Sequence, residues 1–197
     1  MRPGAAGLLL LALGGCTAVI VPPPAPERPL RAAILDHGRH SSLMLELPAG
    51  EGLVRYSYGD WDWYALGRTG VGQGSAALLW PTQAALGRRR YAAPAVAPAE
   101  MPAAAVAPLR VPVEEALWFA ADEDRVRALV AQLDAVFAAN MGTRVYNPAF
   151  DLEFVHYPAS YTLTDNSNAK VAEWATALGA DVQGSVLLSA WALRERQ

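Results

Sequence analysis

The sequence has a single cysteine and only three histidines among its 197 residues. One cysteine excludes an intramolecular disulfide, so the fold must be stabilised by its core alone. The net charge is -3, and no basic run is longer than Arg88-Arg89-Arg90, which argues against nucleic-acid binding. The apolar run at residues 8–13 is too short to cross a bilayer as a helix. The scarcity of histidine leaves few candidates for acid–base chemistry.

The start of the chain has the pattern of a secretory signal. Arg2 precedes the apolar run, and Leu13-Gly14-Gly15-Cys16 follows it. This arrangement resembles a bacterial lipobox, in which the signal is cut before a cysteine that carries a diacylglycerol thioether. We therefore expect a signal peptide at residues 1–15 and lipid attachment at Cys16, with the membrane as a partner. The alternatives are a free or buried thiol and an uncleaved membrane anchor.

The expected location is the cell envelope, as a lipid-anchored protein on a membrane surface. In a Gram-negative cell this would be the periplasmic side of the outer membrane. Residues 22–29 read Pro-Pro-Pro-Ala-Pro-Glu-Arg-Pro, which favours an extended spacer. We expect residues 16–29 to be the lipidated cysteine and its tether, and residues 30–197 to form a single globular domain.

The first half of the expected domain has strand-like patterns. Residues 31–35, 41–47 and 53–58 are apolar runs separated by glycine and proline, as in the neighbouring strands of one sheet. Residues 91–112 are rich in alanine and proline and match neither periodicity, which indicates a long surface loop.

The second half has two helical patterns. Residues 122–140 place apolar side chains at spacings of three and four, with Asp122 as a cap. A second helix is expected from Ser167 or Asn168 to Leu178, with Gly179 ending it. Residues 146–163 between them predict short strands and loops. The fold class is therefore α+β, an antiparallel sheet with packed helices.

Two of the histidines lie in one turn, Asp36-His37-Gly38-Arg39-His40-Ser41-Ser42. A histidine there could act as a general base, since its ordinary pKa is close to neutral. A solvated turn histidine is the alternative. A zinc site would use His37, His40 and Asp36 or Asp60, but this spacing matches no recognised zinc motif. We expect no metal and no cofactor.

Residues 56–64 form an aromatic cluster that could line a ligand cleft, with Trp61, Trp63 and Tyr64 as candidates. Asp60 or Asp62 could face a histidine or a ligand. Alternatively, the aromatic rings pack in the core while the aspartates cap the next turn. The cluster at residues 165–168 is similarly ambiguous, because it fits either a helix cap or a nucleophile at a helix start.

Four segments together carry a resemblance: residues 36–45, 59–64, 77–82 and 166–179. Their order resembles that in the urease-region conserved hypothetical proteins, a bacterial domain-of-unknown-function family. That family is in turn distantly similar to the circularly permuted NlpC and papain-like hydrolases. The resemblance implies a permuted papain-like fold, in which a histidine near the start of the sheet pairs with a cysteine at the start of a later helix.

Residue by residue, the resemblance places His40 at the histidine position. Ser167 stands at the cysteine position, and Lys170 stands where the family has a tryptophan. A hydroxyl is a weaker nucleophile than a thiol. We therefore expect a binding or scaffold lipoprotein that keeps the hydrolase-like fold without thiol chemistry, with Asn168 in its ligand cleft.

The alternative is a serine-variant amide or ester hydrolase, or an acyltransferase. Ser167 would be its nucleophile and His40 its base, with Asp60, Asp62 or His156 orienting the base. Its substrates would be envelope peptides or lipids. A third possibility is a metal-dependent function through His37 and His40.

Overall fold

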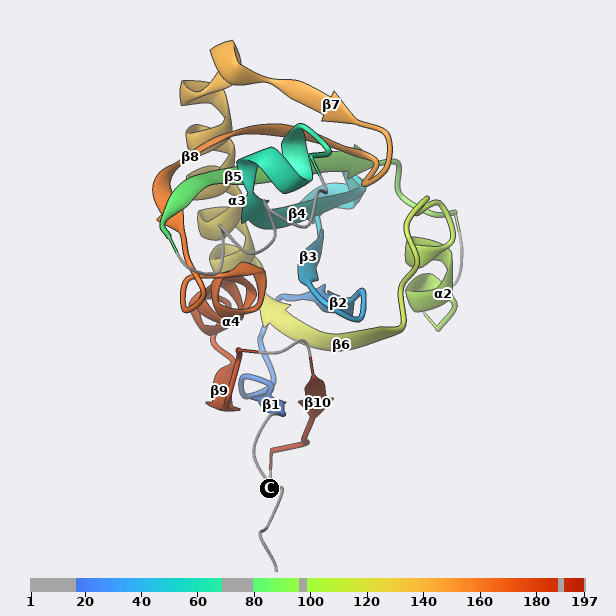
Figure 1. The fold of residues 1–197 in the computed structure, drawn as a ribbon. Coiled ribbons are helices and arrows are strands. Elements are labelled where there is room, and N and C mark those ends of the chain that lie inside the picture. The colour runs from blue at the N-terminus through green and yellow to red at the C-terminus, as the bar shows by residue number, and fades with distance from the viewer. Residues whose placement is uncertain (1–16, 69–79, 96–98, 188–189, 197) are drawn as a thin grey trace, which may run out of the picture.

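The computed structural model describes residues 17–68, 80–95, 99–187 and 190–196. The predicted signal peptide and Cys16 lie outside these residues. Within them, the chain forms two sheets (Figure 1). The large sheet is antiparallel and is covered by helices, and the small sheet has three strands. The α+β class expected from the sequence is confirmed. No helix in the described ranges is long and apolar enough to cross a membrane.

Seven strands form the large sheet. Their bounds are β2 Pro29–Asp36, β3 Ser41–Glu46, β4 Leu53–Asp60, β5 Thr82–Tyr91, β6 Glu115–Asp122, β7 Val145–Asn147 and β8 Leu152–Tyr161. They stand in the order β6-β2-β3-β4-β5-β8-β7, and each neighbouring pair is antiparallel. Strands β2, β3 and β4 confirm the three strands predicted from their apolar runs.

Strand β8 corrects the prediction of short strands and loops at residues 146–163. It runs for ten residues in spite of Pro158. The pairing of β5 with β8 shifts between Gln83 and Ala85, opposite the stretch between His156 and Ser160 that contains Pro158. A bulge accepts a proline because the ladder hydrogen bond is already interrupted there.

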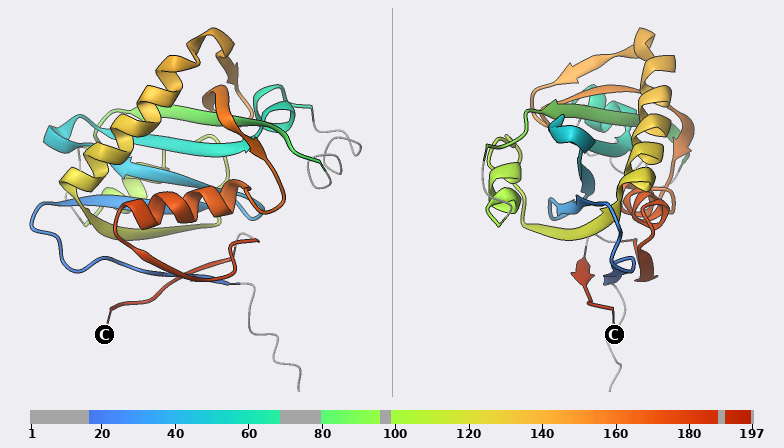
Figure 2. Two further views of the ribbon diagram at one scale, coloured as in Figure 1. Left: turned by 90° about the vertical axis from the view of Figure 1, so that its left-hand side faces the viewer. Right: turned by 180° about the vertical axis from the view of Figure 1, so that it is seen from behind.

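Two helices cover one face of the large sheet, as the two views in Figure 2 show. They are α3 Glu123–Ala139 and α4 Ser167–Ala177, and both were predicted. The Asp122 carboxylate accepts a hydrogen bond from the amide of Asp124 and so caps α3, as expected. Beyond α4, Gly179 has a φ of 94°, a left-handed conformation that glycine adopts without strain.

The opposite face carries the π-helical turn η2 Trp61–Ala65 and the helix α2 Met101–Val106. Of the two short 3-10 turns, η1 Pro48–Gly50 joins β3 to β4 and η3 Met141–Thr143 follows α3. Helix α2 corrects the prediction of a loop over residues 91–112. Its Ala105 is fully buried against Ala33, Leu35, Met44 and Leu53 of the sheet, and this tertiary contact is not visible in the local pattern.

The small sheet changes the expected role of residues 16–29. Its strands are β1 Ala18–Val21, β9 Asp181–Gly184 and β10 Trp191–Leu193, and β1 lies between the other two. Residues 18–21 are therefore part of the fold and not of a spacer. Ala18 and Ile20 are fully buried, because strands from both ends of the chain cover the edge of the main core.

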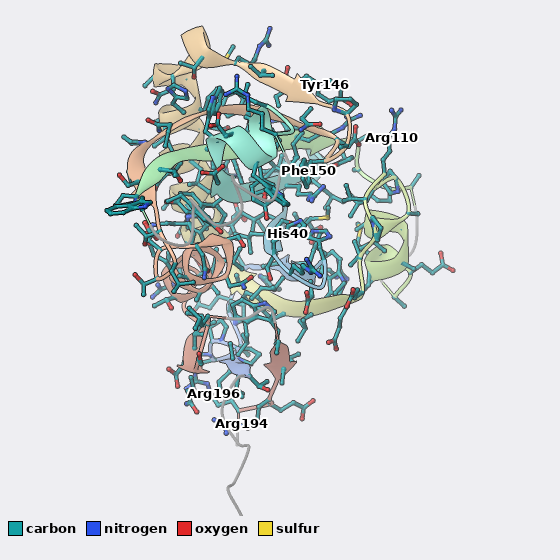
Figure 3. The ribbon with its side chains drawn as sticks, viewed as in Figure 1. His40, Arg110, Tyr146, Phe150, Arg194 and Arg196 are labelled. Carbon is teal, nitrogen blue, oxygen red and sulfur yellow. The ribbon has the colours of Figure 1, made fainter. Side chains whose placement is uncertain are left out.

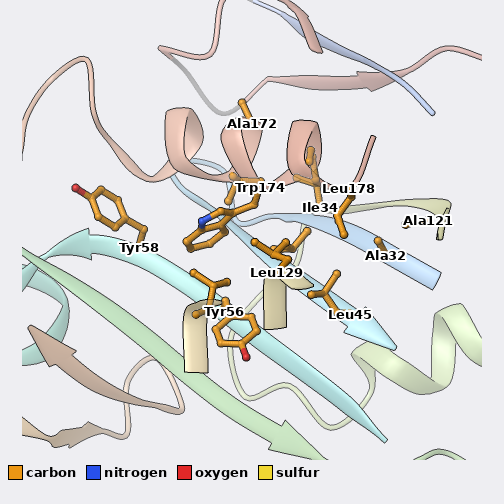
Figure 4. Close-up of a cluster of buried hydrophobic side chains, with 14 of the residues drawn as sticks. Ala32, Ile34, Leu45, Tyr56, Tyr58, Ala121, Leu129, Ala172, Trp174 and Leu178 are labelled. Carbon is orange, nitrogen blue, oxygen red and sulfur yellow. The ribbon is translucent and has the colours of Figure 1, made fainter. Parts of the chain in front are cut away.

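The main core lies between the large sheet and its two long helices (Figure 4). Trp174 of α4 is 2% exposed and packs edge-on against Tyr56 of β4, with the ring centroids 6.5 Å apart. The Tyr56 hydroxyl donates to the Asp134 carboxylate of α3 at 2.7 Å. These contacts join both helices to the centre of the sheet.

Trp174→Ala should lower the free energy of unfolding by about 3–5 kcal/mol, because it leaves a large cavity between α4 and β4. Urea unfolding followed by circular dichroism measures this loss. Trp80 is 72% exposed and supplies the matched control. Trp80→Ala should change stability by less than about 0.5 kcal/mol, and equal losses in the two variants would contradict this description of the core.

Candidate functional site

The turn between β2 and β3 brings two histidines together. The His37 amide donates to the His40 carbonyl at 3.0 Å, and Gly38, with a φ of 87°, donates its amide to the Asp36 carboxylate at 2.7 Å. The two imidazole rings stack with their centroids 4.8 Å apart. The turn therefore fixes both side chains on one surface of the sheet.

Hydrogen bonds define the tautomer of His37. Its Nδ1 lies 2.6 Å from the Pro112 carbonyl oxygen, which can only accept, so Nδ1 carries the proton. The lone pair on Nε2 then accepts from the Ser42 hydroxyl at 2.9 Å and from the Arg55 guanidinium at 3.2 Å. Both ring nitrogens of His37 are occupied, so this histidine is not available as a general base.

Arg55 of β4 is the centre of this network and is fully buried. Its Nε donates to the Ser42 hydroxyl at 3.0 Å, and its Nη1 donates to the Phe150 carbonyl at 3.3 Å. Burial, and then the Arg55 charge, lowers the pKa of His37 to about 4. Burial, followed by the charges of His37 and Arg55, lowers the pKa of His40 to about 3. Both imidazoles are therefore neutral at pH 7.

His40 differs from His37 because its ring has no hydrogen bond to any of the described residues. It is half-buried and meets the rings of Tyr64 and Phe150 edge-on, at centroid distances of 5.4 and 6.0 Å. Figure 3 shows His40 and Phe150 on the same side of the molecule. A neutral imidazole held in this way can offer one donor and one acceptor to a ligand.

Ser167 and Asn168 lie at the start of α4, on the other face of the sheet. Both are buried, and the side chain of Asn166 accepts from the amides of Asn168 and Ala169 at 2.9 and 3.0 Å. Asn168 also accepts from the Ser41 hydroxyl at 2.9 Å. This cluster therefore caps α4 and ties the helix to β3.

The structure brings the His40 turn and the start of α4 together. Ser41, next to His40, contacts Asn168, next to Ser167, and no hydrogen bond within the described residues joins the side chains of His40 and Ser167. Successive residues of a strand point to opposite faces. Ser41 faces α4, whereas Ser42 faces Arg55 and His37, and the contacts of His40 lie on that second side.

The remaining predicted orienting residues have other partners. Asp60 accepts from the Trp63 amide at 2.8 Å and from the Thr82 hydroxyl, so it caps η2. Asp62 pairs with Arg68, and the ring of His156 packs against Trp61 with centroids 4.2 Å apart. The pairing of Asp60 with a histidine is thus not seen, because the cap uses its carboxylate.

Of the predicted cleft residues, Tyr64 packs its ring against that of His40. Trp61 and Trp63 are partly buried against the small core around Ala85, Leu152 and Phe154. Lys170, at the tryptophan position of the resembling family, pairs with Asp165 and Glu173 at 3.3 and 2.7 Å. It also lies over the ring of Tyr58, so its contacts belong to the packing of α4.

Sequence analysis missed Arg55, Ser42 and Phe150. A usable signal was the arginine inside the otherwise apolar and aromatic run at residues 53–58, because a charged residue at a buried strand position needs polar partners. Phe150 gave no such signal, since it reaches the site from a loop far along the chain.

No group of three or more histidine, cysteine, aspartate and glutamate side chains in the described residues is placed to hold a metal ion. A surface groove of about 400 Å³ is lined by Arg88, Arg89, Arg90, Tyr146 and Glu153. Its three arginines are already paired with Asp134 or Asp151, so the groove offers no free cation from them.

No family model, curated protein or solved structure matches the chain. The likeness to the permuted hydrolases therefore stays a prediction that rests on the four segments.

Acidification from pH 7 to pH 5 should destabilise the protein by on the order of 1–2 kcal/mol for each turn histidine. The folded pKa values of about 4 and 3 lie below the ordinary value of 6.5. The unfolded chain therefore binds protons that the folded chain does not, and stability is lost as the pH falls below 6.5. Urea unfolding at pH 7, 6 and 5 measures the slope.

His40→Phe keeps the ring contacts and removes one titrating group, so about half of this pH-dependent loss should disappear. An unchanged slope in His40→Phe would show that the histidine is not held neutral by its surroundings.

Proposed function

We propose that the protein is a lipid-anchored binding protein of the cell envelope, which takes up a ligand at the surface around His40. The observation that carries the proposal is the contrast between the two histidines. Both ring nitrogens of His37 are bonded, whereas His40 is half-buried among aromatic rings and its nitrogens bond to none of the described residues. Such a group is available for a ligand and fixed in position.

The anchor part of the proposal rests on the sequence. A basic residue, a short apolar run and two glycines before Cys16 form the lipoprotein signal pattern, and this cysteine is the only one in the chain. Several acyl chains on one residue hold a protein permanently at a bilayer, at about 0.8 kcal/mol per buried CH₂.

Binding is favoured over hydrolysis because serine needs an aligned base at the moment of attack. Ser167 has no hydrogen bond to His40, and the lone pair of His37 is filled by Ser42 and Arg55. The low pKa of His40 also makes it a weak base at neutral pH. These features support a fold that holds a ligand without cutting it.

A peptide is the ligand class that the site suits best. An amide group offers one donor and one acceptor, and these match the two nitrogens of the neutral His40 ring. Tyr64 and Phe150 provide apolar surface beside the ring for a small side chain. In the envelope, peptidoglycan stem peptides have this chemistry.

Cys16→Ser should abolish incorporation of labelled palmitate and release the protein from the membrane fraction. The sulfur atom of the Cys16 thiol forms the thioether, and a serine hydroxyl cannot form one. Thr17→Ser, one residue along, is the matched control and should label like the wild type. Equal labelling of Cys16→Ser and the wild type would overturn the anchor.

Peptidoglycan fragments released by a muramidase should shift the imidazole ¹⁵N resonances of His40 and be recovered intact. His40→Phe keeps the aromatic contacts but loses both nitrogens, so it should weaken binding by tenfold or more, about 1.4 kcal/mol. Titration calorimetry with the same fragments measures the affinity. His156→Gln is the control histidine variant and should bind normally.

Equal affinity in His40→Phe and the wild type would contradict the binding site. Cleavage of the fragments, with fluorophosphonate labelling that disappears in Ser167→Ala and persists in the exposed control Ser160→Ala, would contradict binding without hydrolysis.

A further inference from the structure

The predicted lipid attachment site is very close to the small sheet. Thr17 is the only residue between Cys16 and Ala18, the first residue of β1. Two residues of fully extended chain span at most about 7 Å, so a lipid on Cys16 would be attached within about that length of chain from Ala18. An acylated Cys16 therefore leaves no room for a spacer between the bilayer surface and this sheet.

Strand β1 is also held firmly in the fold. It is the central strand of its sheet, parallel to β10 and antiparallel to β9, and the Ala18 amide donates to the Ala190 carbonyl at 2.8 Å. Ala18 and Ile20 are fully buried. Peeling β1 away to lengthen the tether would break both ladders and expose part of the core.

Two exposed arginines, Arg194 and Arg196, follow β10 at this end of the molecule. The Arg194 amide donates to the Ile20 carbonyl at 2.9 Å, so the contact with β1 continues beyond β10. The Arg196 guanidinium donates from Nε and Nη2 to the Pro22 carbonyl at 3.2 and 3.1 Å. Figure 3 shows both arginines at the end of the molecule where the small sheet lies.

Both arginines retain guanidinium donors for a further partner. Within the described residues neither one forms an ion pair with a carboxylate, and Arg194 bonds to the neutral Gln183 side chain. A surface groove of about 240 Å³ is lined by Val21, Gln183, Arg194, Glu195 and Arg196. The planar guanidinium group of arginine donates pairs of parallel hydrogen bonds to phosphate oxygens.

We propose that the surface of the small sheet around this groove docks on the phospholipid headgroups of the bilayer that holds the anchor, with Arg194 and Arg196 binding lipid phosphates. This inference rests on the proposed lipidation of Cys16. Glu195 also lines this groove and the exposed Asp181 bonds to its Gln183, so the surface carries charges of both signs. The contact therefore depends on guanidinium–phosphate hydrogen bonds rather than on a net positive field, and phosphatidylethanolamine is sufficient as the lipid.

The test uses the full lipoprotein purified from membranes, with mass spectrometry first establishing the acyl mass on Cys16. The protein is then reconstituted in phosphatidylethanolamine nanodiscs, and amide hydrogen exchange is compared with that in detergent. We expect slower exchange at residues 181–187 and 190–196 in nanodiscs. Arg194→Gln with Arg196→Gln should reduce the docked-to-free ratio by about fivefold for each arginine, which corresponds to about 1 kcal/mol.

Arg110→Gln is the matched control, because Arg110 is exposed and lies far from the small sheet in Figure 3. It should keep the full protection. Unchanged exchange at α4 in detergent shows that the double variant is folded, and Arg194→Gln alone gives a milder second variant.

An acylated protein whose small sheet exchanges equally fast in nanodiscs and detergent would overturn docking and leave the anchor intact. Equal protection in the double variant and the wild type would overturn the role of the arginines. An unacylated Cys16 would overturn the anchor and the docking together.

Discussion

The buried guanidinium of Arg55 is the interaction on which the candidate site depends. A charge removed from water is tolerated only where its donors are satisfied, and here Ser42, His37 and the Phe150 carbonyl accept from it. Those three partners come from β3, the β2–β3 turn and the loop before β8. One side chain thus fixes the turn, the tautomer of His37 and the position of Phe150 beside His40.

The alternation of side chains along β3 determines which polar groups lie on the His37 face of the sheet and which lie on the α4 face. Ser41 and Ser42 are neighbours in the chain but serve opposite faces of the sheet, Ser41 bonding to Asn168 of α4 and Ser42 to Arg55. The Trp191 indole donates to the same Ser41 hydroxyl at 2.7 Å, so the inner face is a structural joint between β3, α4 and the small sheet. Asn166 and Asn168, on either side of Ser167, are thereby used in capping α4 and joining it to β3, whereas the His40 ring bonds to none of the described residues.

Much of the fold could be predicted from local patterns, because α3, α4 and β2 to β4 have a clear periodicity and clear caps. Helix α2 and strand β8 could not. Ala105 is buried only because the sheet lies beneath it, and Pro158 fits in β8 only because the partner strand has a bulge there. Strand β1 could not be predicted either. Prolines follow it directly, and its partner strands lie more than 150 residues further along the chain.

The site was predictable in its residue types and not in its pairings. His40 is a candidate site residue from the sequence alone, since the chain has only three histidines. The direction of the side chains in its turn depends on Arg55, which bonds to His37 and Ser42 and belongs to no motif. The sequence pattern alone therefore gave no information about these contacts.

The position of β1 links the two ends of the molecule. With one residue between Cys16 and a central strand, a lipid anchor would restrict the orientation of the whole domain as well as its location. Figure 3 places His40 in the body of the molecule, away from Arg194 and Arg196. A domain docked through the small sheet would therefore hold the His40 surface clear of the headgroups, where a water-soluble peptide can reach it.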